Sequence, residues 1–199
     1  MMKRFFDIVC SVTGITLLSP LFLVLAVWIK KESKGPVFYK QKRVGKNGKE
    51  FQLFKFRSMR IGSDKLGLLT IGGKDPRITK PGNFIRKFKL DEFPQLINVL
   101  IGNMSIVGPR PEVAKYVNLY NEEQLKVLKV KPGITDWASI KFRNENELLA
   151  RAEKPEEFYI SEVMPAKLQM NLLYIEKNNL MVDLKIIWMT LKKIVHDRN

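Results

Sequence analysis

The stretch IVCSVTGITLLSPLFLVLAVWI, residues 8–29, decides how the rest of the chain must be arranged. It carries no charged side chain, and it is as long as the roughly 20 apolar residues that a transmembrane helix needs. A cleaved signal peptide fits poorly, because the apolar run is long and is followed by the basic sequence WIKKESKG rather than by a cleavage site of small residues. We therefore expect a segment that enters the bilayer and remains part of the protein.

Two features of this segment favour a helix that enters the membrane and returns to the same side. Pro20, which follows Ser19 near the middle of the run, cannot donate to the carbonyl four residues earlier, so it predicts a kink or a break. Lys and Arg mark the cytoplasmic side of a membrane. Here they flank the run at both ends: Lys3, Arg4, Lys30, Lys31 and Lys34. We predict a re-entrant helix–break–helix over residues 1–34, with a kinked spanning helix or a buried soluble helix as alternatives.

The composition limits the chemistry that the chain can perform. Its 199 residues hold 35 Lys and Arg against 20 Asp and Glu, and the net charge of +15 predicts an anionic partner: a phosphorylated substrate, a lipid surface or a nucleic acid. The single cysteine, Cys10, rules out an internal disulfide, and together with the single histidine, His196, it nearly excludes a structural zinc site. A His-based triad is not expected, and the sequence has neither a Walker A motif nor GxGxxG.

Residues 35–199 predict a compact, mostly helical α+β domain with long loops. Alternating polar and apolar residues on both sides of Asn47-Gly48 predict a small β-hairpin. Glycines and prolines over residues 60–83 indicate a long loop. We expect helices over 83–101 (interrupted at 91–94), 112–130, 156–177 (with a boundary or kink at Pro165) and 180–195, and an extended or irregular stretch over 134–144. The last helix has an apolar stripe, for packing against the body or the bilayer surface: Leu180, Leu184, Ile187, Trp188, Leu191 and Val195.

The segment KLDEFPQL, residues 89–96, is the strongest candidate for chemistry. Asp91 and Glu92 precede Pro94, so they could simply cap a helix. Adjacent carboxylates also repel each other, and a divalent cation offsets that repulsion. Mg²⁺ is commonly held by one or two carboxylates together with substrate phosphates, and an aspartate can act as a covalent nucleophile without a His partner. Both interpretations stay open on these residues alone.

Two arginines are candidates for phosphate binding. Arg110 lies between Pro109 and Pro111, which restrict the backbone and limit the directions in which the guanidinium can point. A fixed guanidinium suits bidentate recognition of phosphate. Arg86 lies five residues before Asp91. For each arginine, a solvated or structural charge is the alternative.

Several motifs follow one another along the chain: Ser19-Pro20, FKFRSM (54–59), IRKFKLDEFPQLINVLIGNMSIVGPRPE (85–112), KPGIT (131–135) and NNLMVDLKI (178–186). In this order they resemble the bacterial sugar transferases, the monotopic polyprenyl-phosphate phosphoglycosyl transferases. The resemblance covers nearly the whole chain and is to the minimal catalytic form of the family. The block from LDE to VGPRP is its most specific part.

The resemblance implies a reaction at the bacterial cytoplasmic (inner) membrane, with residues 35–199 forming a membrane-associated catalytic domain on the cytoplasmic face. A sugar 1-phosphate would pass from a UDP-sugar to undecaprenyl phosphate with release of UMP, and so start the assembly of a surface glycan. Asp91 would be the nucleophile of a ping-pong mechanism with a phospho-aspartate intermediate. Glu92 would support Mg²⁺ and the reacting phosphate, so both carboxylates are candidate metal ligands.

The resemblance also assigns supporting roles around this pair. Ser19-Pro20 would turn the re-entrant helix. The phosphate- or nucleotide-binding residues would be Arg86, Arg110, Pro109, Pro111, Lys55 and Arg57. Residues 136–145 depart from the Gly-Leu and Gln-containing continuation of many relatives, so the sugar stays unidentified. The expected partners are the UDP-sugar, undecaprenyl phosphate and membrane lipids but no nucleic acid, and a homo-oligomer is left open. The alternative function is a non-enzymatic basic module that is membrane-anchored or binds nucleic acid.

Overall fold

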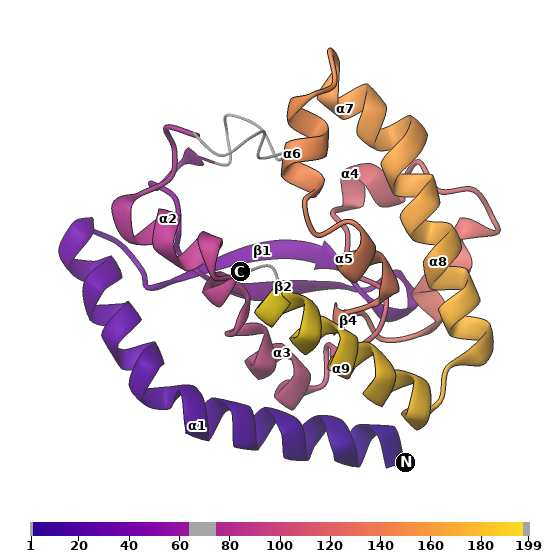
Figure 1. Ribbon diagram of the computed structural model, residues 1–199, viewed down its shortest axis with the longest axis horizontal. Helices are drawn as coiled ribbons and strands as arrows, with labels where there is room; N and C mark the ends of the chain where they lie inside the picture. Colours follow the sequence, from indigo (N-terminus) through magenta and orange to yellow (C-terminus); the bar gives the residue numbers. More distant parts are fainter. Residues whose placement is uncertain (1, 64–74, 197–199) are drawn as a thin grey trace.

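The computed structural model describes residues 2–63 and 75–196 (Figure 1). This part of the chain is mostly helical with two small sheets, which confirms the predicted α+β class. The helices are α1 (Met2–Glu32), α2 (Lys80–Lys87), α3 (Gln95–Ile101), α4 (Ala114–Val117), α5 (Trp137–Lys141), α6 (Glu145–Ala150), α7 (Pro155–Phe158), α8 (Met164–Lys177) and α9 (Leu180–His196). The strands are β1 (Phe38–Val44), β2 (Glu50–Phe56), β3 (Ser105–Val107) and β4 (Gly133–Thr135). Single helical turns are η1 (Lys46–Gly48), η3 (Leu90–Glu92), η4 (Gln124–Lys129) and the π-helical η5 (Tyr159–Val163).

The apolar segment forms one continuous helix, α1, which contains Pro20 and bends part-way along its length (Figure 1). Pro20 leaves the carbonyl of Thr16 without its usual helical N–H donor. The hydroxyl of Ser19 donates to that carbonyl at 2.8 Å, so the Ser-Pro pair supplies its own replacement hydrogen bond. Among the described helices, α1 alone is long and apolar enough to cross a membrane, and most of its apolar stretch is exposed. That exposure argues against the buried soluble helix.

Polar contacts fix the start of α1 to the rest of the protein. The ammonium group of Lys3 donates to the carbonyl of Val107 at 3.0 Å and forms an ion pair with Asp183 of α9. The guanidinium of Arg4 donates to two carbonyls at the end of α3. The carboxylate of Asp7 accepts hydrogen bonds from the Ser105 hydroxyl at 3.0 Å and the Ile106 N–H at 2.9 Å. The N-terminal turns of α1 therefore lie against β3, α3 and α9.

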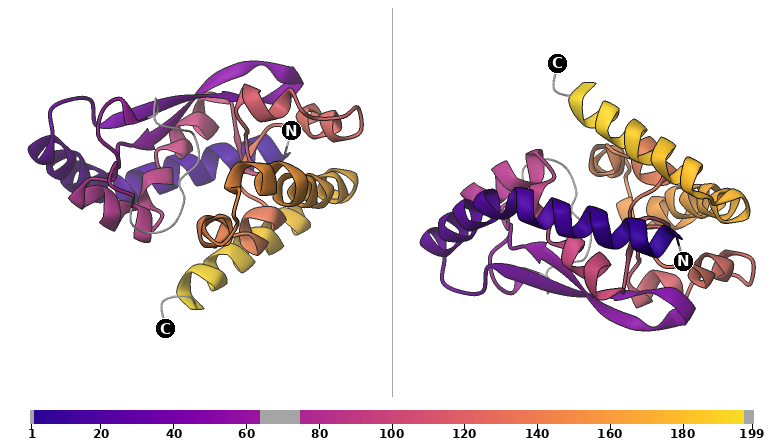
Figure 2. Two further views of the ribbon diagram at one scale, coloured as in Figure 1. Left: turned by 90° about the horizontal axis from the view of Figure 1, so that it is seen from above. Right: turned by 90° about the horizontal axis from the view of Figure 1, so that it is seen from below.

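The predicted hairpin is confirmed. Strands β1 and β2 pair antiparallel, with Phe38 opposite Phe56 and Val44 opposite Glu50. The connection uses left-handed backbone at Asn47 (φ 58°) and Gly48 (φ 73°), the two residue types that tolerate this conformation best. The hairpin lies along one side of the molecule, and β2 contacts α3 and η3, while α1 packs directly against α2 and α3 (Figure 2).

Residues 112–130 do not form the single helix that we expected. They contain only α4 and the short 3₁₀ segment η4. Between these elements, the Asn121 side chain accepts from the Gln124 N–H at 2.9 Å, and the Gln124 side chain accepts from the Asn121 N–H at 3.0 Å. Helix α4 has already ended at Val117, and reciprocal bonds of this kind are typical of the start of a helical segment. The predicted helix is therefore divided into two short pieces.

The expectation for residues 134–144 is only partly correct. The chain is extended through β4, which pairs parallel with β3. Helix α5 then begins at Trp137, because the side chain of Asp136 accepts a hydrogen bond from the Ser139 N–H and caps it. The sequence analysis overlooked this N-cap.

Two other expectations concern segment boundaries. Residues 155–177 are helical through α7, η5 and α8, and the π-helical turn η5 ends just before Pro165, where a boundary was predicted. Helix α2 begins at Lys80 rather than residue 83, since Thr79 caps it by accepting from the Gly82 N–H at 3.1 Å. Residues 64–74 of the predicted loop over 60–83 lie outside the described residues.

Candidate active site

The acidic pair lies in a tight turn between α2 and α3. Helix α2 ends at Lys87, and Lys89 adopts a left-handed backbone conformation (φ 56°). A single 3₁₀ turn, Leu90–Glu92, follows before α3 begins at Gln95. The predicted interruption is therefore confirmed, and the acidic pair occupies the short turn between two helices packed against α1.

Asp91 is a buried carboxylate, with 8% of the residue exposed. Among the described residues, none donates a hydrogen bond to its side chain. Burial raises the pKa of Asp91 and the adjacent Glu92 charge adds to that rise, while Lys55, Arg86 and Lys89 oppose it. An unshared, partly desolvated carboxylate of this kind suits a nucleophile.

Glu92, in contrast, is held by cations. Arg110 donates to both of its carboxylate oxygens, with Nη1 at 3.0 Å from Oε2 and Nη2 bonded to Oε1. The Lys55 ammonium lies 3.7 Å from Oε1. Burial alone would raise the pKa of Glu92, but Arg110 and Lys55 outweigh it and hold the pKa well below its usual range. Glu92 therefore stays ionised and joins three separate segments of the chain.

Lys55 comes from β2 and is itself buried against this pair. Burial lowers the pKa of its ammonium group, and the negative charge of Glu92 partly opposes that effect. The hairpin thus contributes one cation to the site, as the FKFRSM motif suggested.

The Pro109–Pro111 turn presents Arg110 and is pinned from one side by Asp136. The Asp136 carboxylate accepts from the Arg110 N–H at 3.2 Å as well as from α5. The N–H of Gly133 donates to the carbonyl of Pro109 at 2.9 Å. A Cβ atom on Gly133 would lie 2.1 Å from the Gly108 nitrogen, so only glycine permits this approach. The two prolines shape the backbone, and Arg110 supplies the polar group.

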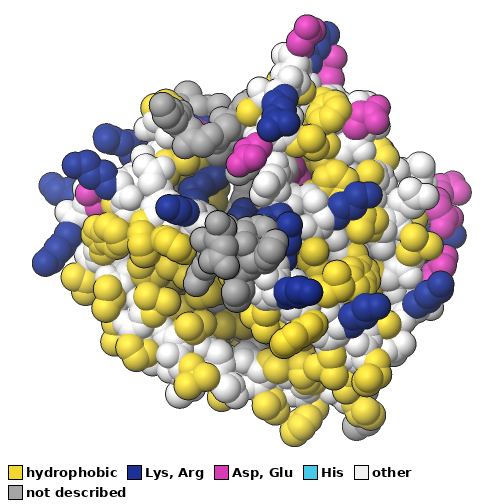
Figure 3. Space-filling view, in the orientation of Figure 1, with side chains coloured by type: hydrophobic (Ala, Val, Ile, Leu, Met, Phe, Trp, Pro, Cys, Tyr) yellow, Lys and Arg dark blue, Asp and Glu magenta, His cyan; other side chains and the backbone are white. Residues whose placement is uncertain are grey.

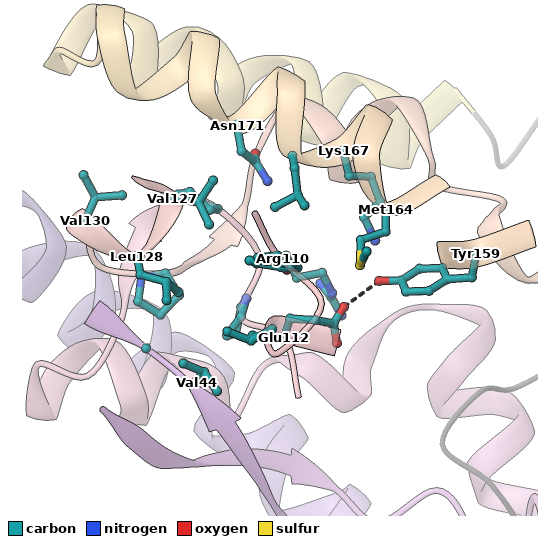
Figure 4. Close-up of a pocket in the computed structure, with 17 residues that line it drawn as sticks. Val44, Arg110, Glu112, Val127, Leu128, Val130, Tyr159, Met164, Lys167 and Asn171 are labelled. Atoms are coloured by element: carbon teal, nitrogen blue, oxygen red, sulfur yellow. Dashed lines mark hydrogen bonds between the residues drawn. The ribbon is translucent and has the colours of Figure 1, made fainter. Parts of the chain in front are cut away.

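Glu112 pins the same turn from the other side. Its carboxylate accepts from the guanidinium of Arg43 at 2.7 Å and from the hydroxyl of Tyr159 at 2.6 Å, the contact dashed in Figure 4. Burial raises the pKa of Glu112, but the neighbouring Arg43 charge and the Tyr159 hydrogen bond outweigh burial and lower it. The sequence analysis predicted none of Arg43, Glu112, Asp136 and Tyr159 as a site residue, although Glu112 ends its most specific motif and Asp136 begins the segment that departs from relatives. Only the acidic residue directly after Pro-Arg-Pro could have drawn attention to one of them.

The remaining predicted residues lie in different places. Arg86 lines the cleft and acts electrostatically on Asp91, and its side chain has no hydrogen bond or ion pair within the described residues. Arg57 borders the cleft, but its guanidinium contacts the C-terminal end of α1. Ser19 and Pro20 lie in the middle of α1 and do not line the cleft.

These groups open onto a cleft of about 880 Å³. Figure 3 shows Lys and Arg side chains gathered near the middle of this face. Hydrophobic side chains cover the lower part of the face. The cleft is lined by the acidic pair and its cations, Lys55, Arg86, Asp91, Glu92 and Arg110. It is also lined by Lys167 and by residues of the 136–145 segment: Ser139, Ile140, Phe142, Arg143 and Glu145. The volume matches that of a large small-molecule site.

The donor atoms at the acidic pair fit Mg²⁺ only if a substrate completes its coordination. Within the described residues there is no cluster of three or more His, Cys, Asp or Glu side chains that could enclose a metal ion. Asp91 and Glu92 offer hard carboxylate oxygens beside an open cleft. This arrangement corresponds to magnesium sites that use one or two carboxylates together with substrate phosphates.

Residues 1–197 match the family model described as Bacterial sugar transferase. This chain belongs to that family. The UDP-glucose:undecaprenyl-phosphate glucose-1-phosphate transferase of Escherichia coli (strain K12) is 40% identical over 197 residues, which cover 97% of this chain and 40% of that protein. The UDP-N-acetylgalactosamine-undecaprenyl-phosphate N-acetylgalactosaminephosphotransferase of Aeromonas hydrophila is 37% identical, over 97% of this chain and 43% of that protein.

Another bacterial sugar transferase is closer to this chain in length. The uncharacterized sugar transferase EpsL of Bacillus subtilis (strain 168) is 37% identical over 194 residues, which cover 98% of this chain and 87% of that protein. The chain therefore spans about two fifths of the length of the two larger relatives and most of the length of this one. The family assignment confirms the predicted resemblance.

Proposed function

We propose that this chain transfers a sugar 1-phosphate from a UDP-sugar to undecaprenyl phosphate and releases UMP. The observation that carries the proposal is the unshared, buried carboxylate of Asp91 beside a Glu92 already neutralised by Arg110. The names of the relatives from E. coli and A. hydrophila support this reaction class. A non-enzymatic basic module, whether membrane-anchored or bound to nucleic acid, would leave the buried carboxylate of Asp91 without a role.

The reaction follows from the chemistry of these groups in two displacements. In the first, a carboxylate oxygen of Asp91 attacks the β-phosphorus of the UDP-sugar, and the bond to the bridging oxygen breaks with its electron pair leaving on UMP. In the second, a phosphate oxygen of the lipid attacks the same phosphorus, and the Asp91 carboxylate leaves. Phosphoryl transfer depends mainly on positioning and charge neutralisation. Lys55, Arg86 and Arg110 line the cleft to provide both.

Asp91 and Glu92 are the residues that would hold Mg²⁺ in this proposal. When bound, the ion supplies positive charge that offsets the diphosphate of the donor. Arg110 keeps Glu92 ionised and fixed in place, so the second carboxylate does not need the metal for its own neutralisation.

The proposal places α1 as a re-entrant anchor on the cytoplasmic side of the inner membrane. Lys3 and Arg4 at one end, and Ile29 and Ser33 at the other, bond to the same body of the protein. A helix tied to one body at both ends would have to release one end to span the bilayer. Helix α9 adds apolar side chains that face outward, among them Trp188 at 69% exposed, which suits contact with the bilayer surface.

The segment 136–145 contacts the donor in this proposal, since Ser139 and Arg143 line the same cleft as the acidic pair. The hydroxyl of Ser139 is buried and has no hydrogen-bond partner among the described residues.

The test is UMP release from a panel of UDP-sugars by the full chain in lipid nanodiscs, with and without undecaprenyl phosphate. We expect one or a few donors to give a stoichiometric burst of UMP without acceptor and continuous release with it. Intact-mass measurement should then show an adduct of one sugar phosphate. Turnover with the lipid but no burst and no adduct would overturn the covalent mechanism, and no turnover with any donor would overturn the function.

A further inference from the structure

Arg57 joins the end of the apolar helix to the strand that serves the site. The residue is 5% exposed and follows β2 directly. Its Nη1 donates to the carbonyl of Lys34 at 2.8 Å, and its Nη2 donates to the carbonyls of Ser33 at 2.8 Å and Ile29 at 3.2 Å. Carbonyls at the end of a helix lack intrahelical donors and carry partial negative charge, so a guanidinium is well matched to this position.

The chain that leaves α1 is shaped around this guanidinium. Gly35 has a φ of +129°, and a Cβ atom there would lie 2.1 Å from Nη1 of Arg57. The backbone N–H of Arg57 also donates to the carbonyl of Val37 at 2.9 Å. The connection between α1 and β1 therefore wraps closely around one side chain, and glycine is required where it passes.

The two residues before Arg57 also make contacts that matter for the site. Lys55 lies 3.7 Å from the Glu92 carboxylate. Phe56 is fully buried against Leu25 and Ile29 of α1 and Ile85 of α2. Three consecutive residues thus contact the acidic pair, the core between α1 and α2, and the end of α1. A shift of α1 relative to β2 would have to break the contacts of Phe56 and Arg57 together, and the residue before them holds the acidic pair.

We propose that Arg57 is a positioning residue that fixes α1 relative to the acidic pair, so that a phosphate at the end of a bilayer-embedded polyprenyl chain reaches Asp91. The inference rests on the proposed function for its substrate. In this proposal Arg57 sets the height of the acidic pair above the lipid and does not bind the nucleotide. Lysine cannot replace it, because a single ammonium cannot reproduce the planar fork that bonds three carbonyls.

The first test compares two acceptors in the full chain. Arg57→Lys, Arg57→Ala and Gly35→Ala, which crowds the same Nη1, should each lower kcat/KM about tenfold or more for undecaprenyl phosphate in nanodiscs. For a short, water-soluble prenyl phosphate, the kcat/KM of each variant should stay within about threefold of the wild-type value. The rate of the UMP burst without acceptor should also stay within about threefold. Arg151→Ala, which removes the exposed arginine that follows α6 directly, is the matched control and should change neither value. Equal losses with both acceptors, or no loss with either, would overturn the proposal.

The second test does not depend on the reaction. Spin labels at Lys31→Cys and Lys49→Cys, in a Cys10→Ser background, report the distance between the end of α1 and the tip of the hairpin. We expect one narrow distance distribution with Arg57 present and a broadened or shifted one with Arg57→Ala. An unchanged distribution would overturn the positioning role even if the chain proves to use another substrate. If the distance result is as expected but the wild type shows no turnover, the proposed function is contradicted and the positioning role is not.

Discussion

Arg110 donates hydrogen bonds from both terminal nitrogens of its guanidinium to the carboxylate of Glu92, while Asp91, the residue directly before it, accepts no hydrogen bond from any described residue. Neighbouring carboxylates are thus given opposite environments. Arg110 and Lys55 keep Glu92 ionised. Burial and the negative charge of Glu92 raise the pKa of Asp91. This asymmetry supports the proposed division of roles, in which Glu92 supports the reaction and Asp91 reacts.

Replacing Asp91 with Asn should abolish the first displacement. The amide is nearly the same size but is a far weaker nucleophile, so we expect the rate of UMP release to fall by about 1,000-fold or more, with no sugar-phosphate adduct by intact mass. Glu156→Gln, which removes an exposed carboxylate paired with Lys115, is the control and should retain full activity. Appreciable UMP release by Asp91→Asn would exclude this residue as the nucleophile.

Replacing Arg110 with Ala should make the activity sensitive to acid. Without this guanidinium, burial raises the pKa of Glu92, and the carboxylate protonates as the pH falls. We expect kcat/KM to drop about 100-fold at pH 8, the cost typical of losing one strong charge-stabilising group. The loss should be larger at pH 6, because the wild-type carboxylate stays ionised there. A ratio of variant to wild type that is constant with pH would contradict this account.

Breaking the contact at the start of α1 should destabilise the protein. Asp183 is 2% exposed and loses its cationic partner in Lys3→Ala. We expect the free energy of unfolding to fall by about 2 kcal/mol. This is less than the roughly 3–5 kcal/mol lost when a fully buried pair is broken, since Lys3 stays partly exposed. Urea unfolding in detergent measures this free energy. Lys126→Ala, which removes an exposed pair with Glu123, should cost under about 0.5 kcal/mol.

The topology of α1 can be tested by cysteine labelling in a Cys10→Ser background. An impermeant thiol reagent added to intact cells should label neither Met2→Cys nor Ser19→Cys, because both would lie away from the outer face. In inside-out vesicles, Met2→Cys should react. Efficient labelling of one of these two positions from outside would indicate a helix that spans the membrane.

Removal of divalent cations should stop turnover. We expect EDTA to eliminate UMP release and added Mg²⁺ to restore it, while the unfolding midpoint stays within about 1 °C, since the described carboxylates do not form a closed metal site. Full activity in EDTA would show that the arginines and Lys55 neutralise the diphosphate without a metal.

The sequence could predict the elements whose signals are local. The hairpin follows from Asn47-Gly48, and the interruption of the helix at Asp91 follows from Pro94. The division of the segment after Glu112 could not be predicted, because α4 ends at Val117 and the reciprocal bonds between Asn121 and Gln124 lie at the start of a separate helical segment, whereas the polar pattern alone would continue one helix.

The candidate site shows the same limit. Arg110 and the acidic pair could be found from their unusual neighbours in the sequence. Asp136 and Tyr159 could not, since their roles depend on the chain bringing residues tens of positions apart next to one turn. The sequence placed Arg57 with the cleft because its motif surrounds Lys55, whereas its guanidinium bonds the end of α1.

The hydrogen bond from Ser19 to the carbonyl of Thr16 bears on where such a protein can reside. In the re-entrant arrangement proposed above, this bent anchor keeps the carbonyl beside Pro20 satisfied and is covered by one leaflet of lipid. Hydrophobic mismatch with the whole bilayer, which tilts or sorts helices that cross it, then contributes little. A chain built in this way can tolerate membranes of different thickness without changing its shape.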